Sequence, residues 1–191
     1  AMRQLAYDTA SRDGGRYAFI ATEALNRVQD FDVVKDPRAR EVLDSVLKQS
    51  RGSLQFLALV DRFNLQDRYP EIVGLAQDQP DSQLAVDAVK LLVNREHRQL
   101  LMQGLRNDDP LRAAALARAL GNATDNKTAA FLAPIVDDAK QPLAVRQESV
   151  KALGKSKAGA RLLLDRVKGK KLADDLTQAA AFSLQTSPLT T

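Results

Sequence analysis

Three prolines punctuate the middle of this chain at nearly constant intervals, and a similar run of small apolar residues follows each of them. Pro80, Pro110 and Pro142 lie 30 and 32 residues apart. The runs after them read SQLAVDAVKLLV, LRAAALARALG and LAVRQESVKALG. Proline suits the first turn of a helix, because its missing N–H has no intrahelical partner there. A helix start repeated in this way predicts an array of similar helical units.

The repeat continues on both sides of the prolines, through SLQFLALVDRF before them and DDLTQAAAFSL after them. The aligned core positions are spaced by 29, 28, 33 and 31 residues: Val60, Val89, Ala117, Val150 and Ala181. A second apolar segment with helical spacing fills each interval, at residues 69–77, 97–107, 128–139 and 159–169. Two helices in each period predict an all-α fold, an α-solenoid of about five and a half two-helix repeats.

Particular residues are expected to mark the helix ends and the buried faces. Gly121 and Gly154 each follow an Ala-Leu pair, where a left-handed residue would end the helix. N-terminal caps are expected from side chains with a carboxylate or hydroxyl oxygen: Asp81, Ser82, Asp108, Asp125 and Asp174. The side chains expected between adjacent helices are Leu120, Leu132, Ile135, Val150, Leu153 and Leu163.

We expect one repeat array over residues 1–191, with an irregular lead-in at 1–14 and a tail at 187–191. Ala1 and Met2 are interpreted as a remnant of an expression vector. The last expected helix, at residues 173–186, has no second helix to cover it. Because a repeat helix buries its apolar face only against its neighbours, we expect this chain to be a segment of a longer protein.

The first helices of these repeats, PLRAAALARALG and PLAVRQESVKALG, resemble the HEAT repeat family. Arg112 and Arg146 lie early in their helices, near the place where that family has a basic residue. The resemblance implies that each arginine bonds to an acidic group in a turn between repeats. The candidate acidic partners are Asp108, Asp109, Asp137 and Asp138.

A narrower resemblance covers most of the chain and is strongest at residues 58–77 and 141–188. These segments look like the helical-repeat part of large multidomain haem-binding proteins of planctomycete-type bacteria, the cytochrome c and membrane-bound dehydrogenase-like proteins. The resemblance implies an exported or periplasmic redox protein in which this segment is a spacer or docking platform for other domains. The sequence contains no C-x-x-C-H motif, so any haem would be bound elsewhere in the full-length protein.

Positive charge is concentrated in the second half of the sequence. Residues 1–95 carry 13 Lys and Arg against 14 Asp and Glu, whereas residues 96–191 carry 15 against 10. Such a cluster is either a solvated helix face or a surface for an anionic partner. The residues of this possible partner patch are Lys151, Lys155, Lys157, Arg161, Lys168, Lys170 and Lys171.

The sequence offers few groups for catalysis or for metal binding. Cysteine is absent and His97 is the single histidine, so a metal site or a catalytic triad would lack members. The carboxylate pairs at 108–109, 137–138 and 174–175 lie at expected helix ends, where capping explains them. DGGR at 13–16 and GKS at 154–156 lack the frame of a phosphate loop. We predict no catalytic, cofactor-binding or metal-binding residue in this segment.

Three functions are compatible with these observations. The first is a non-catalytic scaffold or protein-interaction segment that contacts other domains or another protein and is not inserted in a membrane. The second is a HEAT-like nucleic-acid-binding protein that uses the basic patch, although no stacking aromatic residues accompany it. The third, a repeat lyase acting on a tetrapyrrole, rests on fold analogy alone. We expect the first.

Overall fold

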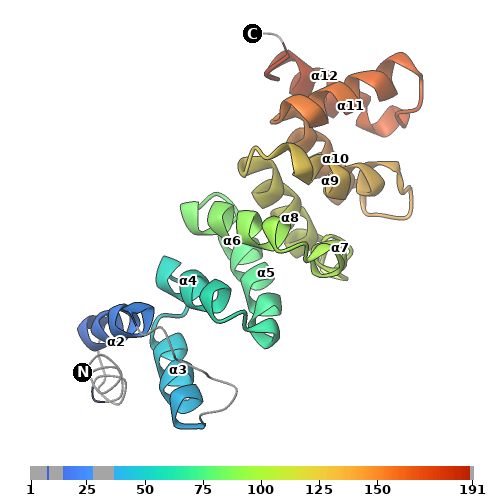
Figure 1. The fold of residues 1–191 in the computed structure, drawn as a ribbon. Helices are drawn as coiled ribbons and strands as arrows, with labels where there is room; N and C mark the ends of the chain where they lie inside the picture. The colour runs from blue at the N-terminus through green and yellow to red at the C-terminus, as the bar shows by residue number, and fades with distance from the viewer. Residues whose placement is uncertain (1–7, 9–14, 28–36, 190–191) are drawn as a thin grey trace. The chain divides into compact units, whose positions relative to one another are not determined.

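A computed structural model describes residue 8 and residues 15–27 and 37–189 of this chain. This described part contains eleven α-helices, α2 to α12, three short 3-10 helices and no β-strand (Figure 1). The prediction of an all-α chain with about eleven helices is therefore confirmed. The chain divides into two compact units, Ala1–Arg68 and Tyr69–Thr191. Apart from Asp8, the expected lead-in at 1–14 lies outside the described residues, and a single array over 1–191 stays a prediction.

The first unit contains three described α-helices and one short 3-10 helix. They are α2 (Gly15–Arg27), α3 (Pro37–Gln49), α4 (Leu54–Arg62) and η1 (Gln66–Arg68). Helix α2 contacts both α3 and α4, and fully buried apolar side chains such as Leu25, Leu43 and Leu59 form its core. Arg40 bonds to Asp44 and Asp67 at 3.0 Å each, which ties α3 to η1. The hydrogen bond to Asp44 raises the pKa of Arg40 above its usual value.

The second unit holds the remaining eight α-helices and two short 3-10 helices. They are α5 (Tyr69–Asp78), α6 (Gln83–Asn94), α7 (Arg98–Leu105), α8 (Pro110–Asn122), η2 (Asn126–Thr128), α9 (Ala129–Asp137), α10 (Leu143–Gly154), α11 (Lys157–Lys168), η3 (Asp174–Leu176) and α12 (Thr177–Gln185). Helices α6, α8, α10 and α12 contact one another in that order, and we call them the first series. Helices α5, α7, α9 and α11 do the same and form the second series. Residues about thirty positions apart therefore lie on neighbouring helices.

The predicted core of the second unit is confirmed at its centre. All six apolar side chains expected between helices are fully buried: Leu120, Leu132, Ile135, Val150, Leu153 and Leu163. The expected register fails in the last helix, because Ala181 is exposed and Ala180 takes the buried position. Val167, in the apolar segment at 159–169, is 41% exposed.

Side-chain caps begin several helices, although not always through the expected residue. Ser82 accepts from the Ala85 N–H at the start of α6, and Asp125 accepts from the Lys127 N–H at η2, as predicted. At α8 the cap is Asp109, which accepts from the Leu111 N–H, and not Asp108. Asp174 lies inside η3 and does not cap it. The fifth candidate, Asp81, accepts hydrogen bonds from two side chains of α8 instead, as described below.

The expected role of proline holds for only one of the three. Pro110 is the first residue of α8, so its missing N–H removes no helical hydrogen bond. Pro142 lies one residue before α10, and Pro80 lies before the Ser82 cap of α6. In both cases the residues that follow the proline, and not the proline itself, form the first turn of the helix.

The prediction that Gly121 and Gly154 end their helices in a left-handed conformation is wrong. Both glycines lie within the last turn of their helices, α8 and α10, and neither has a positive φ. Non-glycine residues take the left-handed conformation after four helix ends, that of α8 included: Asn64, Glu96, Thr124 and Lys170. After α11, for example, the Lys171 N–H donates to the Arg166 carbonyl and the Lys170 N–H donates to the Val167 carbonyl. This pair of bonds is the Schellman arrangement, which satisfies the last free carbonyls of a helix.

The two glycines are needed instead because first-series helices approach one another closely there. A Cβ on Gly121 would lie 2.7 Å from the Ala152 Cα, and a Cβ on Gly154 would lie 2.7 Å from the Ser183 Cβ. These contacts join α8 to α10 and α10 to α12. The absence of a side chain at Gly121 and at Gly154 therefore allows the close spacing of α8, α10 and α12.

Candidate protein-interaction surface

Arginine–carboxylate pairs connect neighbouring helices throughout the second unit. The most buried is Arg146 of α10, whose side chain is 7% exposed. Its Nη1 donates to Asp175 Oδ2 of η3 at 2.8 Å, and its Nε donates to the Val136 carbonyl at the end of α9 at 3.4 Å. Arg146 therefore joins three elements that belong to successive periods of the sequence.

Arg112 of α8 makes the corresponding contact in the opposite direction along the chain. Its Nη2 lies 3.2 Å from Asp78 Oδ1, and its Nε donates to Gln77 Oε1 at 3.2 Å. Both of these acceptors lie at the end of α5. The prediction that Arg112 and Arg146 each bond to an acidic group is therefore correct, but the four candidate partners, Asp108, Asp109, Asp137 and Asp138, are all wrong. Asp109 is already engaged as the cap of α8, and the acids nearest to the two arginines in space come from other periods.

The second-series helices have an ion pair of their own, which was not foreseen. Arg166 of α11 donates two hydrogen bonds to the Asp137 carboxylate of α9, at 2.8 and 2.6 Å. Because these hydrogen bonds to Asp137 stabilise the charged guanidinium, the pKa of Arg166 is raised above its usual value. The two residues are 29 positions apart, so the repeat period could have suggested the pair. Beside them is an open hollow of about 480 Å³, also lined by Asp165 and Lys171.

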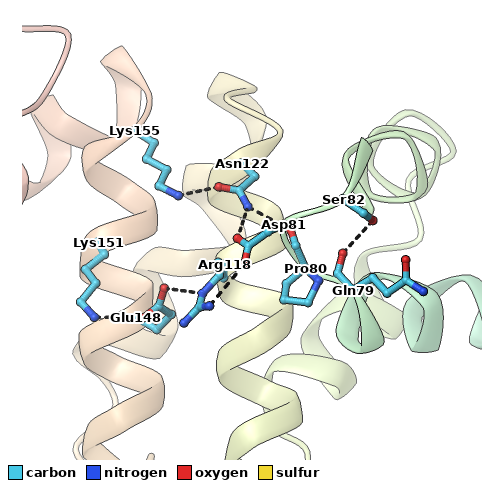
Figure 2. A network of polar contacts seen from close by, with 9 residues as sticks. All are labelled: Gln79, Pro80, Asp81, Ser82, Arg118, Asn122, Glu148, Lys151 and Lys155. Atoms are coloured by element: carbon cyan, nitrogen blue, oxygen red, sulfur yellow. Dashed lines mark hydrogen bonds and ion pairs between the residues drawn. The ribbon is translucent and has the colours of Figure 1, made fainter. Parts of the chain in front are cut away.

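A polar network joins the turn before α6 to the first-series helices α8 and α10, as Figure 2 shows. Arg118 of α8 reaches between Asp81, before α6, and Glu148 of α10, at 3.4 and 3.1 Å. The hydrogen bond with Glu148 is the main reason that the pKa of Arg118 is raised. Asn122, one turn further along α8, donates to the Pro80 carbonyl at 2.9 Å and to Asp81 Oδ1 at 3.0 Å.

Two of the predicted partner-patch residues belong to this network. The Lys155 Nζ donates to Asn122 Oδ1 at 2.5 Å, and the Lys151 Nζ donates to Glu148 Oε2 at 3.1 Å (Figure 2). Both lysines therefore bind side chains of their own fold. The seven-residue patch predicted from the sequence is not one uniform surface, because these two members are paired.

The other five patch residues are exposed: Lys157, Arg161, Lys168, Lys170 and Lys171. None of the five side chains forms an ion pair or hydrogen bond with another described residue. Lys157, Arg161 and Lys168 lie at positions i, i+4 and i+11 of α11, which places them on one side of that helix. We call these three residues the α11 stripe. The buried residues of α11, Gly159, Ala160 and Leu163, lie on the other side.

His97 is half-buried and packs against an aromatic ring of the second unit. Its ring centroid lies 3.8 Å from that of the fully buried Tyr69. Burial lowers the pKa of His97, and the charge of Arg95 lowers it further. Within the described ranges, no group of three or more His, Asp or Glu side chains is placed to hold a metal ion.

The paired carboxylates have separate neighbours. Asp137 binds Arg166, whereas Asp138 accepts from the Lys140 N–H at 3.1 Å, and this bond lowers the pKa of Asp138. Asp175 binds Arg146, as described above. Ser156, from the GKS sequence, caps α11 by accepting from the Gly159 N–H. The first two residues of the DGGR sequence lie outside the described part of the chain.

The chain matches no protein-family model, no curated protein and no solved structure. In the part of the chain that the structure describes, every helix is too short or too polar to cross a membrane. The surfaces described above are therefore interpreted from their own geometry.

Proposed function

We propose that this chain is a non-catalytic scaffold, a HEAT-like helical array that holds other domains or another protein. The ties between neighbouring helices are the observation that supports this proposal best. Asp137 with Arg166 and Arg146 with Asp175 are each 29 residues apart, and Arg118 with Glu148 are 30 apart. Ties at the period of the sequence are typical of repeat proteins, in which each unit is stabilised by its neighbours. An experimental structure in which successive helix pairs superimpose after shifts of about thirty residues would test the HEAT-like part.

The scaffold function predicts a protein partner in contact with the second unit. Chemical cross-linking of the native protein, followed by mass spectrometry, can detect one through the exposed lysines of this unit. Cross-links from several of them to one other protein or domain are the expected result. Cross-links confined to this chain would contradict the proposal.

We further propose that the scaffold belongs to a larger, exported redox protein. Support for this comes from the resemblance of residues 58–77 and 141–188 to the repeat part of multidomain haem-binding proteins. Translation of the flanking coding sequence tests it directly. A C-x-x-C-H motif in the same reading frame is expected, and a complete reading frame without one would remove the redox assignment while leaving the scaffold function intact.

Nucleic-acid binding is the second candidate, and the unpaired cations of α11 and the turn after it favour it. A duplex-binding protein neutralises several phosphates at once, so its affinity falls steeply with salt. We expect no tight binding of a fluorescent DNA duplex at ~150 mM salt. Sub-micromolar affinity that is lost when Lys168, Lys170 and Lys171 are replaced with Glu would favour nucleic acid over the scaffold.

A further inference from the structure

We propose that the α11 stripe docks an acidic, partly apolar segment of a partner protein, a proposal that rests on the scaffold function above. The first support comes from a contrast with four arginines of the second unit. Arg112, Arg118, Arg146 and Arg166 each bind a carboxylate on a neighbouring element. The α11 stripe, in contrast, binds no carboxylate among the described residues.

The stripe lies along nearly the full length of one helix. Lys157 is the first residue of α11 and Lys168 is the last. Eleven residues of helix rise about 16 Å. The neighbouring second-series helix does not extend this charge, because the exposed or half-buried residues of α9 are Ala130, Pro134 and Asp137. The basic surface thus runs along α11 and does not spread onto α9.

Apolar side chains lie directly beside these cations. Leu164 falls between Arg161 and Lys168 on the same side of α11 and is half-buried. Val167 lies next to it and is 41% exposed. A partner that carries both carboxylates and apolar side chains would cover the whole surface, because it would pair the charges and remove the exposed aliphatic groups from water.

Nucleic acid fits this surface less well. Its backbone requires cations that converge from several elements, whereas the α11 stripe comes from one helix. Single-stranded binding relies on exposed aromatic rings, and α11 contains none. The apolar neighbours Leu164 and Val167 would remain uncovered beneath a phosphate backbone. An acidic protein segment is therefore the occupant that the geometry favours.

One carboxylate beside the α11 stripe should weaken the binding of an acidic partner, and replacing it therefore tests the docking proposal. Asp165 is exposed, lies one helical turn after Arg161 and forms no ion pair with a described residue. It would repel an acidic partner that approaches Arg161. Replacing it with the isosteric amide should therefore strengthen docking, which is an effect that loss of folding cannot imitate.

The probe is a fluorescent synthetic peptide that forms a helix with glutamate and leucine side chains on one face. Its binding to the full chain is measured by fluorescence anisotropy at ~150 mM salt. We expect the triple variant Lys157→Glu, Arg161→Glu and Lys168→Glu to weaken binding by about tenfold or more. We expect Asp165→Asn to strengthen it by a few-fold.

The matched control changes the same number of charges elsewhere, at Lys48, Lys90 and Lys140, each replaced with Glu. These three side chains are exposed, so the control has the same net charge without altering α11. We expect it to weaken peptide binding only slightly, through the long-range field. Circular dichroism of both triple variants confirms that each is folded before its affinity is compared.

Several results would overturn the docking inference. They are no measurable peptide binding, equal losses in the stripe variant and in the control, or no change with Asp165→Asn. A DNA duplex bound more tightly than the peptide through the same three residues would assign the stripe to nucleic acid. If the docking inference fails while cross-links still join the second unit to a protein partner, the scaffold function stands without it.

Discussion

Gly121 of α8 lies so close to Ala152 of α10 that a Cβ on the glycine would come within 2.7 Å of the Ala152 Cα and 2.8 Å of its Cβ. Atoms of the backbone cannot move aside as a flexible side chain can. The distance between these two helices therefore depends on a hydrogen atom at position 121.

Gly121→Ala should lower the free energy of unfolding by about 1–3 kcal/mol, because α8 and α10 must separate to admit the methyl group. Gly74→Ala in α5 is the matched control, since its Cβ would meet only the Arg112 Nη2, at 3.7 Å. That change should stabilise the chain by about 0.5–1 kcal/mol through helix propensity. Urea unfolding of both variants measures the difference, and equal effects of the two substitutions would contradict the close-contact explanation.

Asp175→Asn should destabilise the chain more than Asp78→Asn. Both remove the carboxylate partner of an arginine, but the Arg146 side chain is 7% exposed and the Arg112 side chain is 43% exposed. An arginine left unpaired in the interior costs more than one that water can reach, so we expect about 2 kcal/mol for the first and under 1 kcal/mol for the second. Thermal unfolding of the two variants checks the order, and equal losses of stability would show that the exposure of the arginine does not matter.

Ser149→Ala should leave the stability unchanged or raise it by up to about 1 kcal/mol. The Ser149 side chain is fully buried, and its hydroxyl has no hydrogen-bond partner among the described residues. Removing an unsatisfied polar group eliminates its desolvation penalty. Ser156→Ala is the control, because Ser156 caps α11, and its loss should cost about 1 kcal/mol. A clear loss of stability in Ser149→Ala would show that the hydroxyl has a partner such as water.

Lys170→Gly should raise the free energy of unfolding by about 1 kcal/mol. Lys170 has a φ of 51°, a left-handed conformation that is strained for any residue with a Cβ. Lys168→Gly, two residues earlier and inside α11, removes the same charge but should cost about 1 kcal/mol of helix propensity. In chemical unfolding we expect Lys170→Gly to raise the free energy of unfolding and Lys168→Gly to lower it. A lower free energy of unfolding in both variants would argue against the left-handed turn.

Stability should fall as the pH drops through and below 6.5, and His97→Gln should remove this part of the dependence. Burial and Arg95 lower the pKa of His97 in the folded state below its usual value of 6.5. In that range the unfolded chain binds a proton that the folded chain does not, so protonation favours unfolding. Because His97 is the single histidine, His97→Gln removes the whole contribution of histidine titration to the pH dependence of stability. Unfolding free energies measured at about pH 7 and about pH 5.5 provide the test, and identical slopes with and without His97 would contradict it.

The sequence predicted the helices and the central core because their signal is local. Apolar residues at three- and four-residue steps determine which face of a helix is buried, as at Leu120 and Leu153. The carboxylate partners of the arginines could not be predicted in this way, because an arginine can bind an acidic residue of the preceding period or of the following one at a similar sequence separation. Arg112 reaches back to Asp78, and Arg146 reaches forward to Asp175. Hydrophobic periodicity does not distinguish the two directions.

Glycine had the same ambiguity at the ends of α8 and α10. A glycine in the last turn of a helix suits either a left-handed turn or a close contact with another helix, and the sequence around the glycine is the same in both cases. The sequence pattern also did not predict that the basic patch is divided into paired and unpaired members. Lys151 and Lys157 are only six residues apart, but the first faces Glu148 within its own helix and the second faces solvent on the next helix.

The ties between helices also have a consequence for how the second unit folds. Because they join residues 29 to 42 positions apart, each can form once two neighbouring periods have assembled, without waiting for distant parts of the chain. Such a low contact order favours rapid folding that spreads from any stable pair of helices. It also implies that the amide hydrogens of α8 and α10, which contact helices on both sides, are among the slowest of this unit to exchange with water.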